Sequence, residues 1–454
     1  MSASSSSKRD DPKKARDDAP LVVGAKMPVD AYGEDGTLLL ARGETILSPA
    51  QLQRLRRYDV RFHKDGNRSG RRKGEAGFPG DTMLPFHPTR DLEEEFAGAL
   101  TEPAIQPAPP EPTSTYAQEL PLAEAARVEV KNRLDGVFRS VGANETVDLS
   151  AVRAAALNVL ESVVRNERAL LSLLELRSAD QYTFTHSLNC CVLAIILARR
   201  TGLAHRALPI GVSALLHDIG KLRLPAAILQ KPDTLTPEEW ELVYRHPAIG
   251  FEIAQRSSGG ATDLCNPESI LQHHERMNGS GYPRSLTGRN IGFEGRLIAV
   301  ADVYDAMTSA RSYREAIPGP RVMHWLREKA DLLFDRELVD ALVAAVGVFP
   351  VGSLVMLSSN ELAVIAKVHR VAPLRPVVLV VSDGAGAPLL RPKLLDLSAP
   401  TGPSGPPAIV GLEDPRACKI DPRACLASVD DAALNRLGVT DAPAPARDHI
   451  DVVA

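Results

Sequence analysis

Histidine and aspartate residues recur at nearly even intervals through the middle of the chain, and they are the side chains best suited to chemistry. Neighbouring positions of this kind lie about 27 to 31 residues apart, which is enough for one helix running out and a second running back. Successive helices of a bundle could therefore present them at one level of the core. The candidate ligands are His186, His217, Asp218, His246, His273, His274 and Asp302.

Each of these residues, taken alone, has a structural alternative. A single histidine on an apolar helix is more often a hydrogen-bonded core residue than a ligand, and His246 by itself fits that description. Asp302 could be a paired buried acid, but it interrupts the apolar stretch 297–303. A buried carboxylate is costly unless it is hydrogen-bonded, paired or bound to a metal. We therefore interpret the set as a metal site.

The number and kind of the candidate ligands indicate more than one metal ion. Five imidazoles and two carboxylates exceed the four ligands that one zinc ion needs. A mixed nitrogen and oxygen set with a shared carboxylate suits a pair of divalent ions such as iron or manganese. Two such ions ~3.5 to 4 Å apart could activate water and stabilise an in-line displacement at phosphorus. The pattern therefore predicts hydrolysis of a phosphoester.

Two further segments could contact a phosphorylated substrate. The glycine-rich loop 279–283 directly follows the adjacent histidines, and its alternative role is that of a plain loop anchored by Tyr282. Arg311 and Arg314 lie close in sequence to Asp302, where guanidinium groups could bind phosphate oxygens with two hydrogen bonds each. The alternative for these arginines is a solvated helix end.

Composition, periodicity and capping indicate the helices that must position these side chains. Aromatic residues make up only 4% of the chain while alanine and leucine abound, which favours a helical interior. Helical periodicity extends over about 122–347. Thr236 and Glu239 form a capping box for the helix predicted to carry His246. Asn266 precedes the helix predicted to end at the adjacent histidines.

The N-terminal part of the chain divides by composition. Residues 1–20 are charged and of low complexity, which predicts a disordered tail. Residues 21–63 predict a small α/β accessory module with three strands and a short helix. Residues 64–120 are rich in proline, glycine and arginine, which favours a linker. The three strands are predicted at 27–31, 37–41 and 60–63.

The helical catalytic domain is predicted over 121–348, so that the fold class is mainly α. After it, β-branched runs over 349–398 predict a short antiparallel β meander. Residues 399–454 are again proline-rich and predict a mostly flexible tail. This tail contains Asp-Pro-Arg-Ala-Cys twice, at 414–418 and 421–425. Two cysteines fall short of a closed zinc site, so we interpret the repeat as duplicated linker sequence.

Charge, cysteine usage and hydropathy limit the function classes. The formal net charge is −4 and the pI is about 6.3, so neither a nucleic acid polymer nor an anionic membrane is an expected partner. The five cysteines are odd in number and two are adjacent on an apolar stretch, which does not fit a secreted disulfide framework. No stretch reaches the ~18 apolar residues of a membrane helix. We expect a cytoplasmic protein.

Four motifs together resemble the HD-GYP branch of the HD-domain phosphohydrolases. They are His-Asp-Ile-Gly-Lys at 217–221, His-His-Glu at 273–275, Gly-Ser-Gly-Tyr-Pro at 279–283 and Val-Ala-Asp-Val-Tyr-Asp-Ala at 300–306. The resemblance covers about residues 180–349 and implies an HD-type helical bundle. It also implies a bacterial phosphodiesterase that linearises cyclic di-GMP to pGpG and, in some members, continues to GMP.

The resemblance implies roles for individual residues. The seven candidates would ligate two divalent ions, iron or manganese, with Asp218 bridging them. Lys221 would face the scissile phosphate, and Arg311 and Arg314 would contact the substrate phosphates. The catalytic residues would be His217, Asp218 and Lys221. The residues lining the substrate pocket would include Gly281, Tyr282 and Pro283.

Two positions of this chain depart from the family pattern. Some members carry a third metal on a glutamate one turn before the first histidine, but that position is Tyr182, so we expect two metals. Many members have aspartate where this chain has Asn278.

Diguanylate cyclase (GGDEF) domains are expected partners of the 279–283 loop, and a homodimer is a further expectation. Alternative functions are hydrolysis of another cyclic dinucleotide, such as cyclic GMP-AMP, and binding of cyclic di-GMP without turnover.

Overall fold

The computed structural model divides the chain into two units, residues 1–86 and 87–454. It describes residues 111–143, 145–174, 182–229, 231, 235–259, 263–309, 316–370, 372–400 and 405–437, together with the backbone of three strands in the first unit. These strands form an antiparallel sheet of order β2-β1-β3 and overlap the predicted strand positions. Their bounds are β1 Asp30–Tyr32, β2 Leu38–Leu40 and β3 Arg61–His63. The predicted tail, accessory helix and most of the predicted linker lie outside the described residues.

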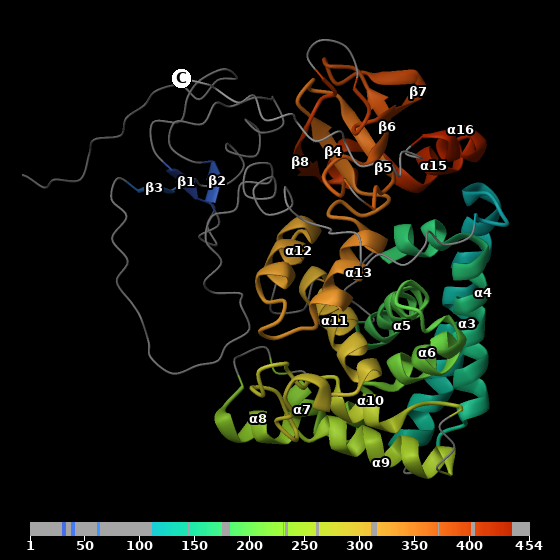
Figure 1. The fold of residues 1–454 in the computed structure, drawn as a ribbon, viewed down its shortest axis with the longest axis vertical. Helices are drawn as coiled ribbons and strands as arrows, with labels where there is room; N and C mark the ends of the chain where they lie inside the picture. The colour runs from blue at the N-terminus through green and yellow to red at the C-terminus, as the bar shows by residue number, and fades with distance from the viewer. Residues whose placement is uncertain are drawn as a thin grey trace, which may run out of the picture. The chain divides into compact units, whose positions relative to one another are not determined.

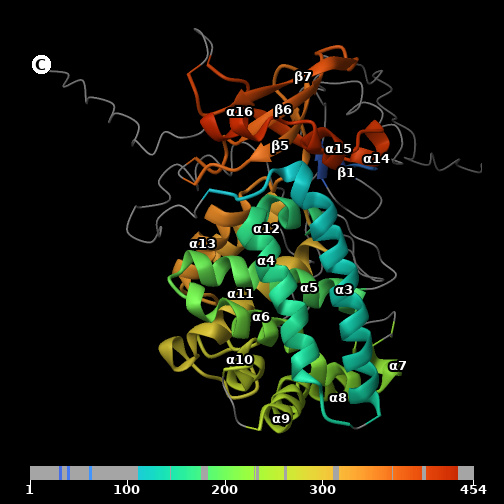
Figure 2. The same ribbon diagram turned by 90° about the vertical axis from the view of Figure 1, so that its right-hand side faces the viewer.

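The second unit is built on helices, as predicted. Two long helices, α3 and α4, run side by side along one side of the unit, and α5 and α11 lie at its centre (Figures 1 and 2). The long helices and those at the centre are α3 Tyr116–Gly142, α4 Leu149–Leu174, α5 Tyr182–Arg200, α6 Ala207–Leu216 and α11 Phe293–Thr308. The shorter elements are η3 Ala204–Arg206, η4 Ile219–Arg223, α7 Ala226–Leu229, α8 Pro237–Val243, α9 His246–Ser258, α10 Pro267–Gln272, η5 Gly288–Asn290, α12 Gly319–Glu328 and α13 Arg336–Val346.

Local capping explains where several of these helices begin. The Thr236 capping box is present, but the helix that it starts ends at Val243, and a separate helix begins at His246. The prediction that a single helix starts at the Thr236 capping box and carries His246 was therefore wrong. Asn266 caps α10 as predicted, and that helix ends where the adjacent histidines begin. Helix α3 begins at Tyr116, inside the range predicted as linker, because Thr115 and Gln118 form a further capping box.

A five-stranded antiparallel sheet of order β7-β6-β5-β4-β8 follows the helices and includes the predicted meander. Its strands are β4 Leu354–Leu357, β5 Leu362–Lys367, β6 Val377–Ser382, β7 Pro388–Asp396 and β8 Ile409–Glu413. The edge strand β7 was not predicted, because its prolines and its exposed polar residues hide the strand pattern. Strand β8 lies in the range predicted as a mostly flexible tail, so that prediction was wrong for these residues. The strand pairs with β4, and its residue Ile409 is buried.

The repeated Asp-Pro-Arg-Ala-Cys sequence forms helices and not linker. In each copy the aspartate side chain accepts a hydrogen bond from the arginine N–H and proline occupies the first turn, so the same local sequence starts a helix twice. The helices are α14 Pro415–Cys418 and α15 Pro422–Ala427, and α16 Asp431–Arg436 follows. Leu426 and Leu434 are fully buried, which attaches these helices to the unit. None of the described helices is long and apolar enough to span a membrane.

Buried ion pairs fasten α4 to its neighbours. Glu119 of α3 is fully buried and accepts hydrogen bonds from Ser162 at 2.7 Å and from Arg165 at 2.8 Å, both on α4. Arg168 of α4 pairs with Asp431 of α16 at 2.7 Å and also donates to a carbonyl oxygen of β5. Helix α4 therefore links the helices to the C-terminal sheet.

We predict that Glu119→Ala lowers the free energy of unfolding by about 2 kcal/mol, because it leaves buried Ser162 and partly buried Arg165 of α4 without their acceptor. Urea unfolding followed by circular dichroism measures this change. Asp135→Ala removes an exposed ion pair from the same helix and should cost less than about 0.5 kcal/mol. Equal effects of the two substitutions would contradict the assigned role of Glu119.

Candidate metal centre

The seven candidate ligands, scattered over more than a hundred residues of sequence, meet in one place. Three lie where helices begin or end: His217 follows α6, His246 begins α9, and His273 follows α10. His186 and Asp302 lie inside the central helices α5 and α11. These side chains are almost completely buried, with exposed fractions from 0% to 6%. Asp218 and His274, the neighbours in sequence of two of these histidines, complete the group.

The histidines are oriented by hydrogen bonds on one ring nitrogen. The Nδ1–H groups of His217, His246 and His273 donate to carbonyl oxygens three residues earlier in the chain, at 2.6 to 2.7 Å. His186 Nδ1–H donates to Asp305 Oδ2 at 2.8 Å. Because Nδ1 carries the proton in this network, Nε2 of each ring presents a lone pair to the interior of the group.

The two carboxylates each face histidines on both sides. Oδ2 of Asp218 lies 3.6 Å from His217 Nε2, whereas its Oδ1 lies 3.2 Å from His246 Nε2. Oδ1 of Asp302 lies 3.1 Å from His186 Nε2, whereas its Oδ2 lies 3.8 Å from His274 Nδ1. This is the geometry of carboxylates that could be shared by two cations.

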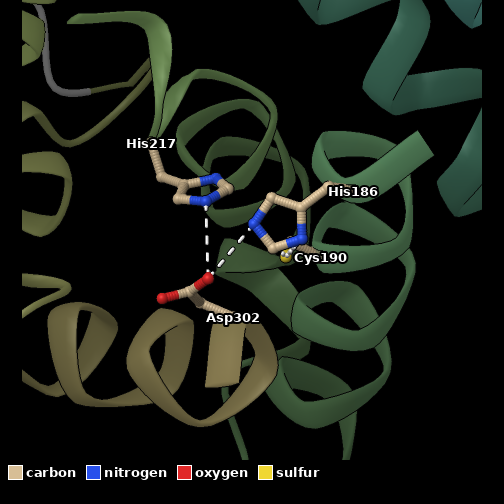
Figure 3. A group of neighbouring side chains, drawn as sticks. All are labelled: His186, Cys190, His217 and Asp302. Carbon is tan, nitrogen blue, oxygen red and sulfur yellow. Dashed lines mark hydrogen bonds and ion pairs between the residues drawn. The ribbon is translucent and has the colours of Figure 1, made fainter. Parts of the chain in front are cut away.

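The donor set fits divalent cations. In two groups, the possible ligand atoms all lie within 4.8 Å of one another. One group holds His186, Cys190, His217 and Asp302, drawn in Figure 3, and the other holds Asp218, His246, His273 and His274. Within the described residues, His217 Nε2 and Asp218 Oδ1 are buried without a hydrogen-bond partner. Buried acceptor atoms that face one another are suited to holding a cation between them.

The electrostatics of the group favour the protonation states that bind metal. Burial, followed by neighbouring histidines, lowers the pKa of His273 and of His274 well below the ordinary value. Burial would raise the pKa of Asp218, but Lys221 and His217 bring it well below the ordinary value. Burial alone would raise the pKa of Asp302, but the neighbouring His186 and His274 imidazoles bring it well below the ordinary value. Neutral imidazoles and ionised carboxylates are the ligand forms that divalent metals require.

Three neighbours of the centre were not predicted from the sequence. Asp305 holds His186 through Oδ2, and Asn189 donates to its Oδ1 at 2.7 Å. Cys190 Sγ lies 3.7 Å from His186 Nδ1 and 3.9 Å from its Nε2, so the thiol lies against this ring within the group drawn in Figure 3. Burial raises the pKa of the Cys190 thiol to about 12, so the sulfur is a poor ligand at neutral pH. Helical spacing from His186 and Asp302 is the signal that could have identified all three.

The predicted substrate-facing residues that the structure describes lie beside the centre. Lys221, in η4, places Nζ 2.5 Å from Asp218 Oδ2. The ring of Tyr282 stacks on the ring of His274, with centroids 4.7 Å apart. Gly281 allows this approach, because a Cβ there would meet the His274 carbonyl oxygen at 2.4 Å. Pro283 is exposed and follows Tyr282 through a cis peptide bond. The side chain of Tyr182, and both Arg311 and Arg314, lie outside the described residues.

The loop 279–283 is fixed by Glu275. This buried carboxylate accepts hydrogen bonds from the backbone N–H of Arg284 at 2.7 Å and of Leu286 at 2.9 Å. Asn278, the unusual residue at the loop entry, is exposed and accepts from the Ser280 N–H and hydroxyl. Aspartate could accept the same two bonds, so the departure at Asn278 leaves the turn chemistry unchanged.

Comparison with known proteins decides the family. A family model described as HD domain matches residues 174–338, and one described as KOW domain associated with HD domain matches residues 354–401. The cyclic di-GMP phosphodiesterase PA4108 of Pseudomonas aeruginosa is 36% identical over 317 residues, which are 68% of this chain and 74% of that protein. The chain belongs to the HD-GYP family of HD-domain proteins.

Two further relatives match this HD-GYP protein over shorter lengths. The cyclic di-GMP phosphodiesterase response regulator RpfG of Xanthomonas campestris is 37% identical over 191 residues, 40% of this chain and 49% of that protein. The 3′3′-cGAMP-specific phosphodiesterase 1 of Vibrio cholerae is 37% identical over 166 residues, 36% of this chain and 38% of that protein. The chain thus spans half or less of these two relatives.

We predict that Asp305→Asn weakens binding of divalent metal about 10- to 100-fold, because it removes the carboxylate that fixes the ring and tautomer of His186. Calorimetric titration with manganese measures this affinity. Asn278→Asp is the matched control, since its side chain lies at the exposed turn and should leave the metal content unchanged. Unaltered metal affinity in Asp305→Asn would show that the orientation of His186 does not matter, and a large change in Asn278→Asp would show that the loop is misplaced.

Proposed function

We propose that this HD-GYP protein is a metal-dependent phosphodiesterase that hydrolyses cyclic di-GMP, with pGpG or GMP as the end product. The observation that carries the proposal is the pair of buried carboxylates, Asp218 and Asp302, each facing histidine nitrogens on both sides. The names of the relatives PA4108 and RpfG support cyclic di-GMP as the substrate. A pure binding module would not need so complete a ligand set.

In this proposal the seven residues hold two divalent ions, iron or manganese. One metal position lies among His186, His217 and Asp302. The other lies among Asp218, His246, His273 and His274. Bound there, the cations would supply Lewis acidity towards the phosphodiester and lower the pKa of a nucleophilic water.

The remaining residues position the substrate. Lys221 lies against Asp218 with its side chain 29% exposed, so its ammonium group is available to a phosphate oxygen arriving at the centre. Tyr282 covers His274 and forms a wall of the site. Because the centre is buried around ionised carboxylates, the positive charge of Lys221 acts at short range on the charge that develops on phosphorus oxygens. Arg311 and Arg314 are proposed to add phosphate contacts.

Partner binding is proposed for the exposed part of the same loop. Pro283, Arg284 and Ser285 are exposed beside the centre, so a diguanylate cyclase (GGDEF) domain could contact them without displacing a ligand. A homodimer is a further proposal.

We predict that the purified full chain, loaded with manganese or iron(II), converts cyclic di-GMP to pGpG or GMP, and that His217→Ala loses more than about a hundredfold in kcat/KM. The loss follows from removal of a metal ligand. Product chromatography on a side-by-side panel of cyclic di-GMP, cyclic GMP-AMP and cyclic di-AMP measures the activity and the preference.

His205→Ala is the matched control, because this histidine is exposed in η3 and outside the ligand set. It should retain full activity. Binding of cyclic di-GMP with no product from the metal-loaded chain would contradict hydrolysis and favour a non-catalytic effector. Exclusive turnover of cyclic GMP-AMP would contradict the assigned substrate.

A further inference from the structure

A ladder of aromatic rings leads from the metal centre to the surface. His274, Tyr282, Tyr244 and Trp240 follow one another with ring centroids 4.7, 4.4 and 5.6 Å apart, and we call them the aromatic ladder. The interplanar angles along it are 30°, 41° and 30°, so the outer two pairs are stacked and the middle pair, Tyr282 and Tyr244, is tilted. Trp240 lies in α8 and Tyr244 at its C-terminal end, so two of the rings are far in sequence from the 279–283 loop.

The position of Tyr244 is set by the same turn that sets a metal ligand. Tyr244 caps the C-terminus of α8, and His246 begins α9 only two residues later. The backbone N–H of Tyr244 donates to the Trp240 carbonyl oxygen at 2.8 Å, which fixes the last turn of the helix. Tyr244 is linked to the centre through Tyr282, whose ring contacts both His274 and His246, with centroids 4.7 and 6.4 Å apart.

Tyr244 is exposed, whereas a residue that only covered the 279–283 loop would be buried. It keeps 44% of its surface exposed, although its ring touches Tyr282, and Tyr282 in turn is mostly covered. An aromatic ring contributes to a protein core chiefly by burying its apolar surface, and nearly half of this residue's surface stays exposed. An exposed ring stacked beside a buried reaction centre is instead suited to an aromatic group of the ligand.

We propose that Tyr244 is a substrate-binding residue that stacks against a purine base of the cyclic dinucleotide while the phosphodiester lies at the metal centre. This inference rests on the proposed function and adds the base-binding surface to it. Each phosphate of a cyclic dinucleotide is flanked by a planar base, and aromatic rings bind such bases by stacking. Stacking tolerates any base, so Tyr244 contributes to affinity for both guanine and adenine rings and does not select between them.

The test compares Tyr244→Ala with Tyr244→Phe in the metal-loaded full chain. Tyr244→Ala should raise KM for cyclic di-GMP about five- to a hundredfold, the range for loss of one base-stacking ring, with a much smaller change in kcat. Tyr244→Phe keeps the ring and should restore KM. Leu390→Ala removes an exposed apolar side chain from the C-terminal sheet and should leave KM unchanged.

A second measurement observes the stacking itself. A cyclic dinucleotide that carries 2-aminopurine should lose fluorescence on rapid mixing with the wild-type chain and with Tyr244→Phe, before turnover, but not with Tyr244→Ala. Unchanged KM together with unchanged quenching in Tyr244→Ala would overturn the proposal. Loss of bound metal in Tyr244→Ala would also overturn it, since Tyr244 would then only position His246. Absence of hydrolysis by the wild-type chain would contradict the proposed function, whereas the quenching experiment tests Tyr244 separately.

Discussion

The structure depends on one electrostatic constraint: two carboxylates are buried among histidine nitrogens that have no proton to offer them. The Nδ1–H groups of His217, His246 and His273 are already donated to backbone carbonyl oxygens, so their Nε2 atoms face Asp218 and Asp302 as acceptors. Burying ionised carboxylates in such surroundings costs several kcal/mol unless a positive charge compensates. Divalent cations would supply that charge, and their binding would account for so polar a group at the centre of an apolar helical unit.

Several helices begin or end at this centre, and their terminal turns position its histidines. Helix α6 stops before His217, α9 starts at His246 and α10 stops before His273. Each of these histidines donates to a carbonyl oxygen in the last turn of the preceding helix, α6, α8 or α10. The same terminal turns lead directly into the residues that are proposed to face the substrate. Lys221 follows on η4, and the loop held by Glu275 brings Tyr282 against His274.

The sequence was informative where chemistry is local and silent where it depends on tertiary packing. The candidate metal ligands, the capping residues and the glycine-rich loop lie in short motifs whose residue types are demanded by their chemistry, so their convergence or local role could be predicted. Asp305 escaped notice because its role appears only when α11 packs against α5. Tyr244 escaped for the same reason, since its stacking partner arrives from a loop almost forty residues later. The edge strand β7 lacked a signal because an exposed strand has little need of an alternating apolar pattern.

The most direct test of the central claim is electron paramagnetic resonance of the full chain loaded with manganese(II), combined with the metal content of the same sample. The account predicts two manganese ions per chain and a signal from a spin-coupled pair, because Asp218 and Asp302 each face both ligand groups. One ion per chain with an uncoupled signal, or no retained metal, would contradict a dinuclear centre built on these carboxylates.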